Sequence, residues 1–203
     1  MGQPTECPKC RLPNGSEKLP ISTVAERAGH ADPRVTRTRR LIRDALTSLL
    51  AEKNFASISV LDIAQRATVN RATFYAHFTD KFALLDAIVR EDFAAALAQS
   101  DPLRAGDMRK MLEAVGRAVF AFVNLHRTCR VDRDFEPQFA RAMEAELIEF
   151  LSTSFVHCSA MLVASALVGA AMNWRHQAPK EPPEPIVTNI VGILVGGVRK
   201  ISV

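Results

Sequence analysis

Side chains that could contact a polyanion gather in a short stretch of the sequence between Arg71 and Lys81. An arginine can donate two hydrogen bonds to the O6/N7 edge of a guanine, and the methyl group of a threonine or an alanine can meet that of a thymine. Hydroxyl, imidazole and ammonium groups suit phosphate oxygens, which position a protein on a duplex without reporting its sequence. The residue types therefore predict a base-reading group, made of Arg71, Ala72 and Thr73. A second group would contact phosphates: Tyr75, His77 and Lys81.

The positive charge of the chain is confined to the segment around this stretch. Residues 34–81 hold nine Lys/Arg against four Asp/Glu, whereas residues 1–33 hold four of each and residues 82–203 hold thirteen against fourteen. A basic segment on a nearly neutral body is the electrostatic pattern of a nucleic-acid-binding module. The same charge pattern also fits an ordinary solvated helix face. The secondary-structure elements that carry the charges are therefore needed to distinguish a nucleic-acid-binding module from such a face.

Helix-capping residues predict that two short helices position these side chains. Ser59 and Asp62 have the spacing of a capping box, which would begin a helix over residues 60–67. A tight turn through Thr68 and Val69 follows, and Asn70 is a good N-cap for a second helix, Arg71–His77. Two short helices joined in this way form a helix-turn-helix, whose second helix enters the major groove of DNA. Its small core is predicted to contain Val60, Ile63, Ala64, Ala67, Val69 and Phe74.

Longer helices are predicted on both sides of this motif. Before it, the periodicity indicates a helix that starts at Val35 and stops at Asn54, with an apolar face of Leu41, Ile42, Ala45, Leu46, Leu49 and Leu50. After it, Thr79 and Asp80 would cap a helix over residues 81–99. We therefore predict a three-helix DNA-binding domain over residues 34–81. Residues 1–33 contain five prolines and little apolar periodicity, which indicates a flexible arm.

The segment from Ser59 to Leu85 resembles the DNA-binding signature of the TetR family of bacterial transcriptional regulators, and the similarity extends over residues 36–90. The matching motifs are Ile-Ala, Thr-Phe-Tyr, His-Phe and Asp-Lys-x-x-Leu-Leu, each at the family's spacing. The resemblance implies DNA contacts at Val60, Leu61, Arg71, Ala72, Thr73, Tyr75, Ala76, His77 and Lys81.

Two positions depart from the family pattern. The turn of the motif has Thr68 where the family usually has glycine, and a β-branched residue is disfavoured at positive φ. The turn must therefore either change its geometry or carry a small strain. Phe82 stands where an acidic residue is usual, and we interpret it as extra packing against the regulatory body.

The rest of the chain, residues 82–203, is predicted to form a larger all-α domain. The resemblance implies that this domain binds a ligand and forms a homodimer. The stretch from Phe150 to Trp174 lacks Lys, Arg, Asp and Glu, which a membrane span or a buried bundle helix could explain, and its polar residues favour the bundle. The proline-rich linker over residues 177–185 should be extended or turning. Gly192, Gly196 and Gly197 would allow a close helix approach, so we expect dimerisation through helices near residues 155–176 and 185–201.

A ligand pocket and a metal site can both be considered in this sequence. Six large apolar residues could line a cavity, although their helical spacing also fits an ordinary core: Phe120, Phe122, Phe139, Met143, Met172 and Trp174. His126, Cys129, His157 and Cys158 lack compact metal-ligand spacing, and Cys7 with Cys10 makes only half of a zinc knuckle. We therefore predict no metal and no cofactor.

The sequence as a whole predicts a DNA-binding transcriptional regulator and not an enzyme. It contains no glycine-rich phosphate loop, nucleophile elbow or paired acid motif. No secretory signal opens the chain, so we expect a cytoplasmic protein with free thiols. The expected mechanism is repression relieved by a small-molecule ligand, with activation as the alternative.

Overall fold

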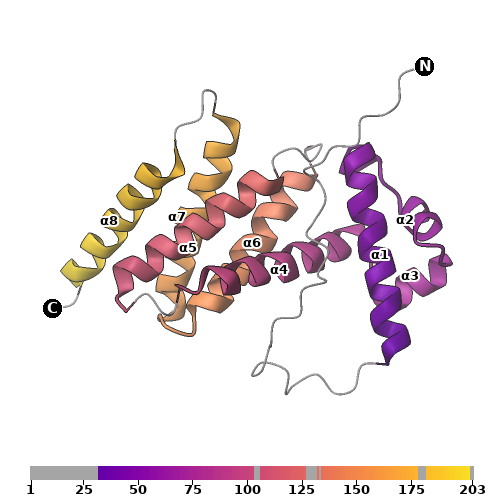
Figure 1. The fold of residues 1–203 in the computed structure, drawn as a ribbon, viewed down its shortest axis with the longest axis horizontal. Coiled ribbons are helices and arrows are strands. Elements are labelled where there is room, and N and C mark those ends of the chain that lie inside the picture. The colour runs from indigo at the N-terminus through magenta and orange to yellow at the C-terminus, as the bar shows by residue number, and fades with distance from the viewer. Residues whose placement is uncertain (1–31, 103–105, 127–131, 133, 178–181, 202–203) are drawn as a thin grey trace. The chain divides into compact units, whose positions relative to one another are not determined.

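The computed structural model describes residues 32–102, 106–126, 132, 134–177 and 182–201. These residues form helices and no strand, which confirms the all-α prediction. The elements in chain order are α1 (Pro33–Glu52), the 3-10 helix η1 (Phe55–Ser57), α2 (Val60–Arg66), α3 (Arg71–His77), α4 (Lys81–Ser100), α5 (Met108–Leu125), α6 (Phe135–Leu151), α7 (His157–His176) and α8 (Pro183–Ile201) (Figure 1).

The chain forms two compact units. Among the described residues, the first consists of 32–84 with 132, and the second of 85–102, 106–126, 134–177 and 182–201. The division lies after Leu84, inside α4, whereas the sequence placed it after Lys81. Residues 1–31, including Cys7 and Cys10, lie outside the described residues, and so does Cys129.

Helices α1, α2 and α3 pack around a small apolar core in the first unit. Ile42, Leu46, Ile63 and Phe74 are fully buried there. Two side chains that the motif analysis overlooked, Phe55 and Ile58, join this core and are also buried. They belong to η1 and the residue after it, a turn that is too short to produce a periodic signal in the sequence.

The structure corrects three details of α1. The helix begins at Pro33, before the predicted Val35, because Asp32 accepts a hydrogen bond from the Arg34 N–H and proline fits the first helical turn. It ends at Glu52, and Asn54 instead precedes η1. Leu41, predicted on the apolar face, is 41% exposed because the helical rotation carries it away from the face that Ile42 and Ala45 bury.

Helices α5 to α8, with the later part of α4, form the second unit. Helix α7 packs on α6 and α5, and α8 packs on α5 (Figure 1). Helix α8 begins at Pro183, inside the segment predicted to be extended or turning. Pro183 and Pro185 lie in its first turn, where the missing N–H groups have no helical partner to lose.

Helix α7 is long and apolar enough to cross a membrane by length and composition alone. Its buried residues contact the neighbouring helices, and they include Ala160, Val163, Leu167 and the charged Arg175. This pattern is that of a helix in the core of a bundle, as the sequence analysis preferred.

Candidate nucleic-acid interface

The predicted capping box at the start of α2 is present. The Ser59 hydroxyl accepts from the Asp62 N–H at 3.1 Å, and Asp62 Oδ2 accepts from the Ser59 N–H at 2.8 Å. The Ser59 hydroxyl also donates to Asp62 Oδ2 at 2.7 Å, and Lys53 Nζ lies 3.1 Å from the same oxygen. Hydrogen bonds from the Ser59 side chain and backbone, with Lys53 next, lower the pKa of Asp62 from 3.8 to about 2. The start of the motif is therefore held by local polar bonds.

The turn of the motif resolves the question raised by Thr68. Its φ is 56°, so the left-handed conformation that favours glycine is kept and threonine adopts it. The Thr68 N–H bonds the carbonyl of Gln65 at 3.1 Å, and the Val69 N–H bonds that of Ala64 at 2.9 Å. These two bonds make the Schellman closure of a helix C-terminus. The turn keeps its geometry and carries a strain of about 1 kcal/mol.

Helix α3 has one buried anchor and an exposed outer face. Asn70 caps the helix by accepting from the Thr73 N–H at 2.6 Å and from the Thr73 hydroxyl at 2.9 Å. Phe74 is fully buried, and the ring of Tyr75, which is 49% exposed, meets it edge-on with the centroids 5.6 Å apart. The helix is therefore held firmly while its outer side chains remain available to a partner.

The structure places most predicted DNA-contact residues on the surface of the first unit. Arg71, Ala72, Tyr75 and Ala76 are exposed on α3, and Leu61 is exposed on α2. The remaining three on these two helices are half-buried: Val60, Thr73 and His77. Because the Thr73 hydroxyl donates to Asn70, its orientation is fixed by the cap of the helix. Their contacts with DNA remain a prediction.

Lys81 has an internal role that the sequence did not indicate. Its ammonium group donates to the carbonyls of Phe55 at 2.9 Å, Ala56 at 3.2 Å and Ile58 at 2.9 Å. It also lies 4.6 Å from the centroid of the Phe55 ring. An ammonium group has three N–H donors, and all three are used here. This geometry favours a structural role for Lys81, in which it holds η1 in place. The predicted contact with a phosphate is less favoured.

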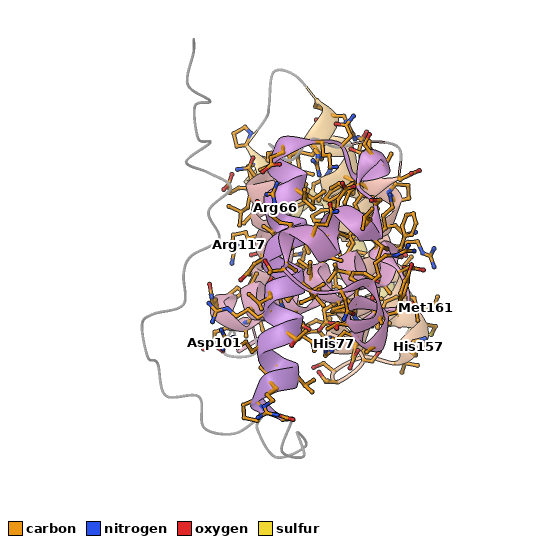
Figure 2. All side chains as sticks on the ribbon, turned by 90° about the vertical axis from the view of Figure 1, so that its right-hand side faces the viewer. Arg66, His77, Asp101, Arg117, His157 and Met161 are labelled. Carbon is orange, nitrogen blue, oxygen red and sulfur yellow. The ribbon has the colours of Figure 1, made fainter. Side chains whose placement is uncertain are left out.

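Phe82 and Arg66 also stabilise the first unit. The Phe82 ring meets that of Phe55 edge-on at 5.3 Å, so it packs within the first unit, and its packing against the regulatory body stays a prediction. Arg66 donates to Ser48 at 2.5 Å and to both carboxylate oxygens of Glu52 at 2.7 and 2.8 Å, joining α2 to α1 (Figure 2). The bond from Arg66 lowers the pKa of Glu52.

The six predicted pocket residues lie in the packed core of the second unit. Five are buried and Met172 is half-buried. Phe122 stacks on Phe139 at 5.8 Å, and Phe120 meets Trp174 at 5.4 Å. The alternative interpretation of these residues as an ordinary core is therefore supported, and their contact with a ligand remains a prediction.

Sequence reasoning missed a polar group beside these rings. The His126 ring lies 4.4 Å from that of Phe122, its Nδ1 is 2.9 Å from the Phe122 carbonyl oxygen, and burial lowers its pKa. Arg175 is buried, donates to the carbonyl of His126 at 3.1 Å and pairs with Glu136 at 3.9 Å. The sequence contained one signal for this group. Arg175 lies at the end of α7, in which no other residue is Lys, Arg, Asp or Glu. Among the described residues, no group of three or more His, Cys, Asp or Glu side chains could hold a metal ion.

Comparison with known proteins finds a family match for the helix-turn-helix segment. Residues 42–88 match the model of bacterial regulatory proteins, tetR family. An uncharacterised HTH-type transcriptional regulator of Bacillus subtilis, YxbF, is 37% identical over 70 residues, which are 34% of this chain and 18% of that protein. The matched segment thus spans under a fifth of the length of this curated relative.

Solved structures extend the likeness of fold to most of the chain. A TetR-family regulator from Streptomyces coelicolor has a TM-score of 0.56 at 22% identity, covering 85% of this chain and 99% of that one. A TetR protein from Acinetobacter baumannii, solved with minocycline, has a TM-score of 0.52 at 22% identity, covering 80% and 96%. A TetR regulator from Streptococcus agalactiae has 0.51 at 21% identity, with the same coverage.

An exposed, basic second helix held by a buried anchor defines the first unit as a helix-turn-helix DNA-binding domain. The match of residues 42–88 to the tetR family model falls on this unit, and the solved structures show that the chain shares the fold of TetR-family regulators.

Proposed function

We propose that this chain is a cytoplasmic, sequence-specific repressor whose dimer places two α3 helices in successive major grooves of operator DNA. The observation that carries the proposal is the outer face of α3. It presents Arg71, Ala72 and Tyr75 to solvent above a buried Phe74, in the one segment of the chain that has a large positive excess. An exposed face on a firmly anchored helix suits the reading of base edges.

A binding experiment on promoter DNA tests the proposal. The full-length chain should bind the promoter fragment of its own gene more tightly than a scrambled duplex of equal length, with an affinity that falls as salt rises. Arg71→Ala should weaken promoter binding by about 1–3 kcal/mol, roughly 5- to 150-fold, and barely affect the scrambled duplex. Arg117→Ala on the exposed surface of α5 is the matched control. Equal losses on both duplexes would contradict base reading by Arg71.

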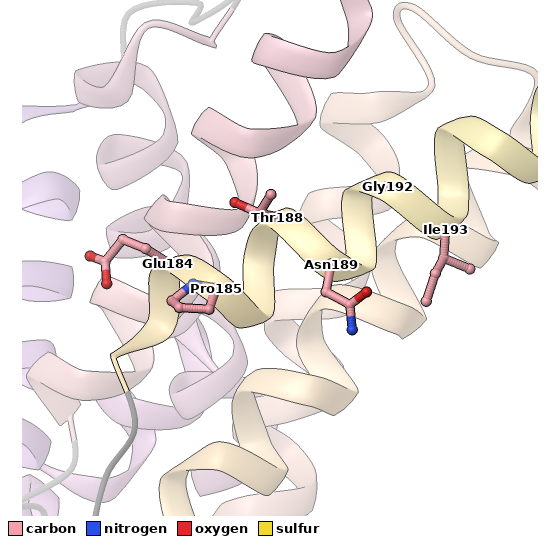
Figure 3. A pocket seen from close by; sticks show the side chains of 6 residues that line it. All are labelled: Glu184, Pro185, Thr188, Asn189, Gly192 and Ile193. Carbon is pink, nitrogen blue, oxygen red and sulfur yellow. The ribbon is translucent and has the colours of Figure 1, made fainter.

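The surface of α7 and α8 supports the proposal of a homodimer. Leu162 is 62% and Ile193 is 68% exposed, and a Cβ atom built at Gly169, Gly192 or Gly196 would meet nothing within 4 Å. An open, shallow pocket lies on the surface of α8 and is lined by residues of that helix alone, between Glu184 and Ile193 (Figure 3). Uncharged, apolar and small residues together suit the close packing of helices from a second copy.

Two glycines offer a matched test of the dimer. Gly196→Glu leaves the packing within one chain unchanged, because nothing lies near the added side chain, and should convert the dimer to monomer in light scattering. Gly116→Ala is the contrasting variant, since its Cβ would lie 2.6 Å from Val187 Cγ1. It should lower stability by about 1–3 kcal/mol through overpacking. A Gly196→Glu protein that stays dimeric would contradict this interface.

We propose that a small apolar or aromatic ligand binds among the aromatic residues of the second unit and releases the DNA. The minocycline complex of the Acinetobacter protein, which shares this fold, supports a ligand response. Helix α4 runs without a break from Lys81 in the first unit to Ser100 in the second, so it can transmit a change between them.

Trp174 provides a direct readout for the ligand. It is the single tryptophan of the chain and packs on Phe120. A small-molecule screen for release of bound promoter DNA should yield compounds that also change the fluorescence of Trp174. A compound that releases the DNA while leaving this emission unchanged would place the ligand elsewhere.

A further inference from the structure

The first two turns of α1 extend beyond the apolar core of the first unit. Ile42 is the first buried residue of the helix, and none of the residues 33–41 is buried. Burial of an apolar face normally accounts for most of the stability of a helix in a protein. Here local bonds must hold the helical turns instead. This part of α1, residues 33–41, is called the α1 extension below.

Three local features hold the α1 extension in a helical conformation. Asp32 Oδ1 accepts from the Arg34 N–H at 2.9 Å, which caps the helix. Pro33 occupies the first helical position, where its fixed φ and missing N–H are tolerated. The Thr38 hydroxyl donates to the Arg34 carbonyl at 2.9 Å. The extension is thus an ordered helical segment that contributes little to the core, and it presents Arg34, Arg37 and Arg40 at the surface, where a partner can contact them.

The side chains of the α1 extension are strongly basic. Four of its nine residues are arginines, namely Arg34, Arg37, Arg39 and Arg40, and none is acidic. Asp44, one turn further on, lies 3.9 Å from Arg40, but both side chains are largely exposed and such pairs contribute little. The concentration of guanidinium groups on an exposed helix is suited to phosphate oxygens, which arginine can contact through two parallel hydrogen bonds.

The α1 extension lies beside the recognition helix. The Arg39 guanidinium is 4.7 Å from the centroid of the Phe78 ring, and Phe78 is the residue that caps the C-terminus of α3. Figures 1 and 2 both show the N-terminal half of α1 next to α3, with His77 labelled near it in Figure 2. A duplex in contact with α3 would therefore have its backbone within reach of this arginine group.

We propose that the α1 extension is a second DNA-binding element, in which Arg34, Arg37 and Arg40 contact the phosphate backbone beside the groove that α3 enters. The inference rests on the proposed function and adds these residues to the interface. The three arginines form one slanted row over about a third of the helix circumference, because a spacing of three residues turns each side chain by only about 60° from the one before it. Such an arrangement suits phosphates on a curved backbone and carries no base-reading role.

The test is the salt dependence of DNA binding by the full chain with Arg34→Gln, Arg37→Gln and Arg40→Gln combined. Fluorescence anisotropy with the promoter fragment and with a scrambled duplex gives the slope of log affinity against log salt concentration. Each lost phosphate contact should reduce this slope by about 0.9, so we expect a total reduction of about 2–3. Affinity at low salt should fall roughly tenfold or more on both duplexes, so their ratio should stay unchanged.

The control variant removes the same charge elsewhere, through Arg109→Gln, Arg117→Gln and Arg141→Gln in the second unit, and should leave the slope close to that of the wild type. Thermal unfolding should be nearly unchanged for both triple variants, because none of the six side chains is buried. If the α1 variant keeps the wild-type slope of log affinity against log salt concentration, the inference is overturned. This holds also if the variant loses repression in cells, because the arginines would then serve an acidic protein partner instead. Wild-type protein that shows no salt-dependent DNA binding would overturn the proposed function itself.

Discussion

The two units distribute charge and apolar surface in opposite ways. The first exposes arginines on α1 and α3 and buries aromatic and aliphatic residues such as Phe74. The second buries Arg175 beside Phe139 and exposes apolar residues such as Leu162 and Ile193. A polyanion requires exposed cations. A second protein chain requires exposed apolar surface, and an apolar ligand requires apolar residues in the interior. The contrast is what the proposed partners, DNA for the first unit and a second chain or an apolar ligand for the second, would require.

Their means of stabilisation differ as well. The short helices α2 and α3 begin at polar caps and rest on one or two large anchors, while the long helices of the second unit rest on extensive mutual burial. A helix of seven residues is not stable alone in water, so its caps and its anchor are both needed. The predictions below test this difference, beginning with the largest effect.

Phe74→Ala should cause the largest loss. Removing a fully buried ring from a small core costs about 3–5 kcal/mol, which should unfold the helix-turn-helix and abolish DNA binding. If the two units are held independently, the urea transition followed by Trp174 in the second unit should hardly move. Phe139→Ala is the reciprocal variant, and it should shift the Trp174 transition strongly. A common shift of both transitions by Phe74→Ala would mean that the units unfold as one.

Lys81→Met should lower stability by about 2 kcal/mol, because it keeps the aliphatic chain but leaves three carbonyls of η1 without their charged donor. Chemical denaturation measures this loss. The salt slope of DNA binding, measured where the variant is folded, should stay unchanged. A slope reduced by about 1 with unaltered stability would instead return Lys81 to the phosphate-contacting group.

Asp62 should make the first unit sensitive to acid. Its pKa in the folded chain is lowered to about 2 from 3.8, so the carboxylate stabilises the fold above about pH 4 and this contribution is lost as the pH falls towards 2. The contribution is about 1 kcal/mol, because a partly exposed carboxylate is screened by solvent. Asp62→Asn should therefore be less stable than wild type at pH 7 and equal to it near pH 2. Asp44→Asn, which changes an exposed acid of α1, should show no such dependence.

Thr68→Gly should give the smallest effect, a gain of about 0.5–1 kcal/mol. Glycine relieves the strain of φ 56°, and part of the gain is offset by the greater freedom of glycine in the unfolded chain. Thr68→Ala removes the branched side chain but keeps the strained backbone, so it should gain less. Melting temperatures would measure both. A loss of stability in Thr68→Gly would mean that the threonine side chain makes a compensating contact.

The sequence by itself determined the parts of this protein that depend on local chemistry. Ser59, Asp62 and Asn70 satisfy backbone groups within three residues of themselves, so their spacing was enough to place α2 and α3. Thr68 could be identified as a position of possible strain because the TetR family usually has glycine there. The motifs that resemble the TetR family lie in this same segment, and residues 42–88 match the family model.

Only the tertiary structure decided the roles that depend on residues distant in the chain. Lys81 serves carbonyls that precede it by more than twenty residues, and Arg175 lies against His126, almost fifty residues away. The exposure of Leu41 and of the α1 extension depended on where the core ends, which no local pattern records. Side-chain type limits what a residue can bind, but the partner it finds is set by the packing of elements that the sequence places far apart.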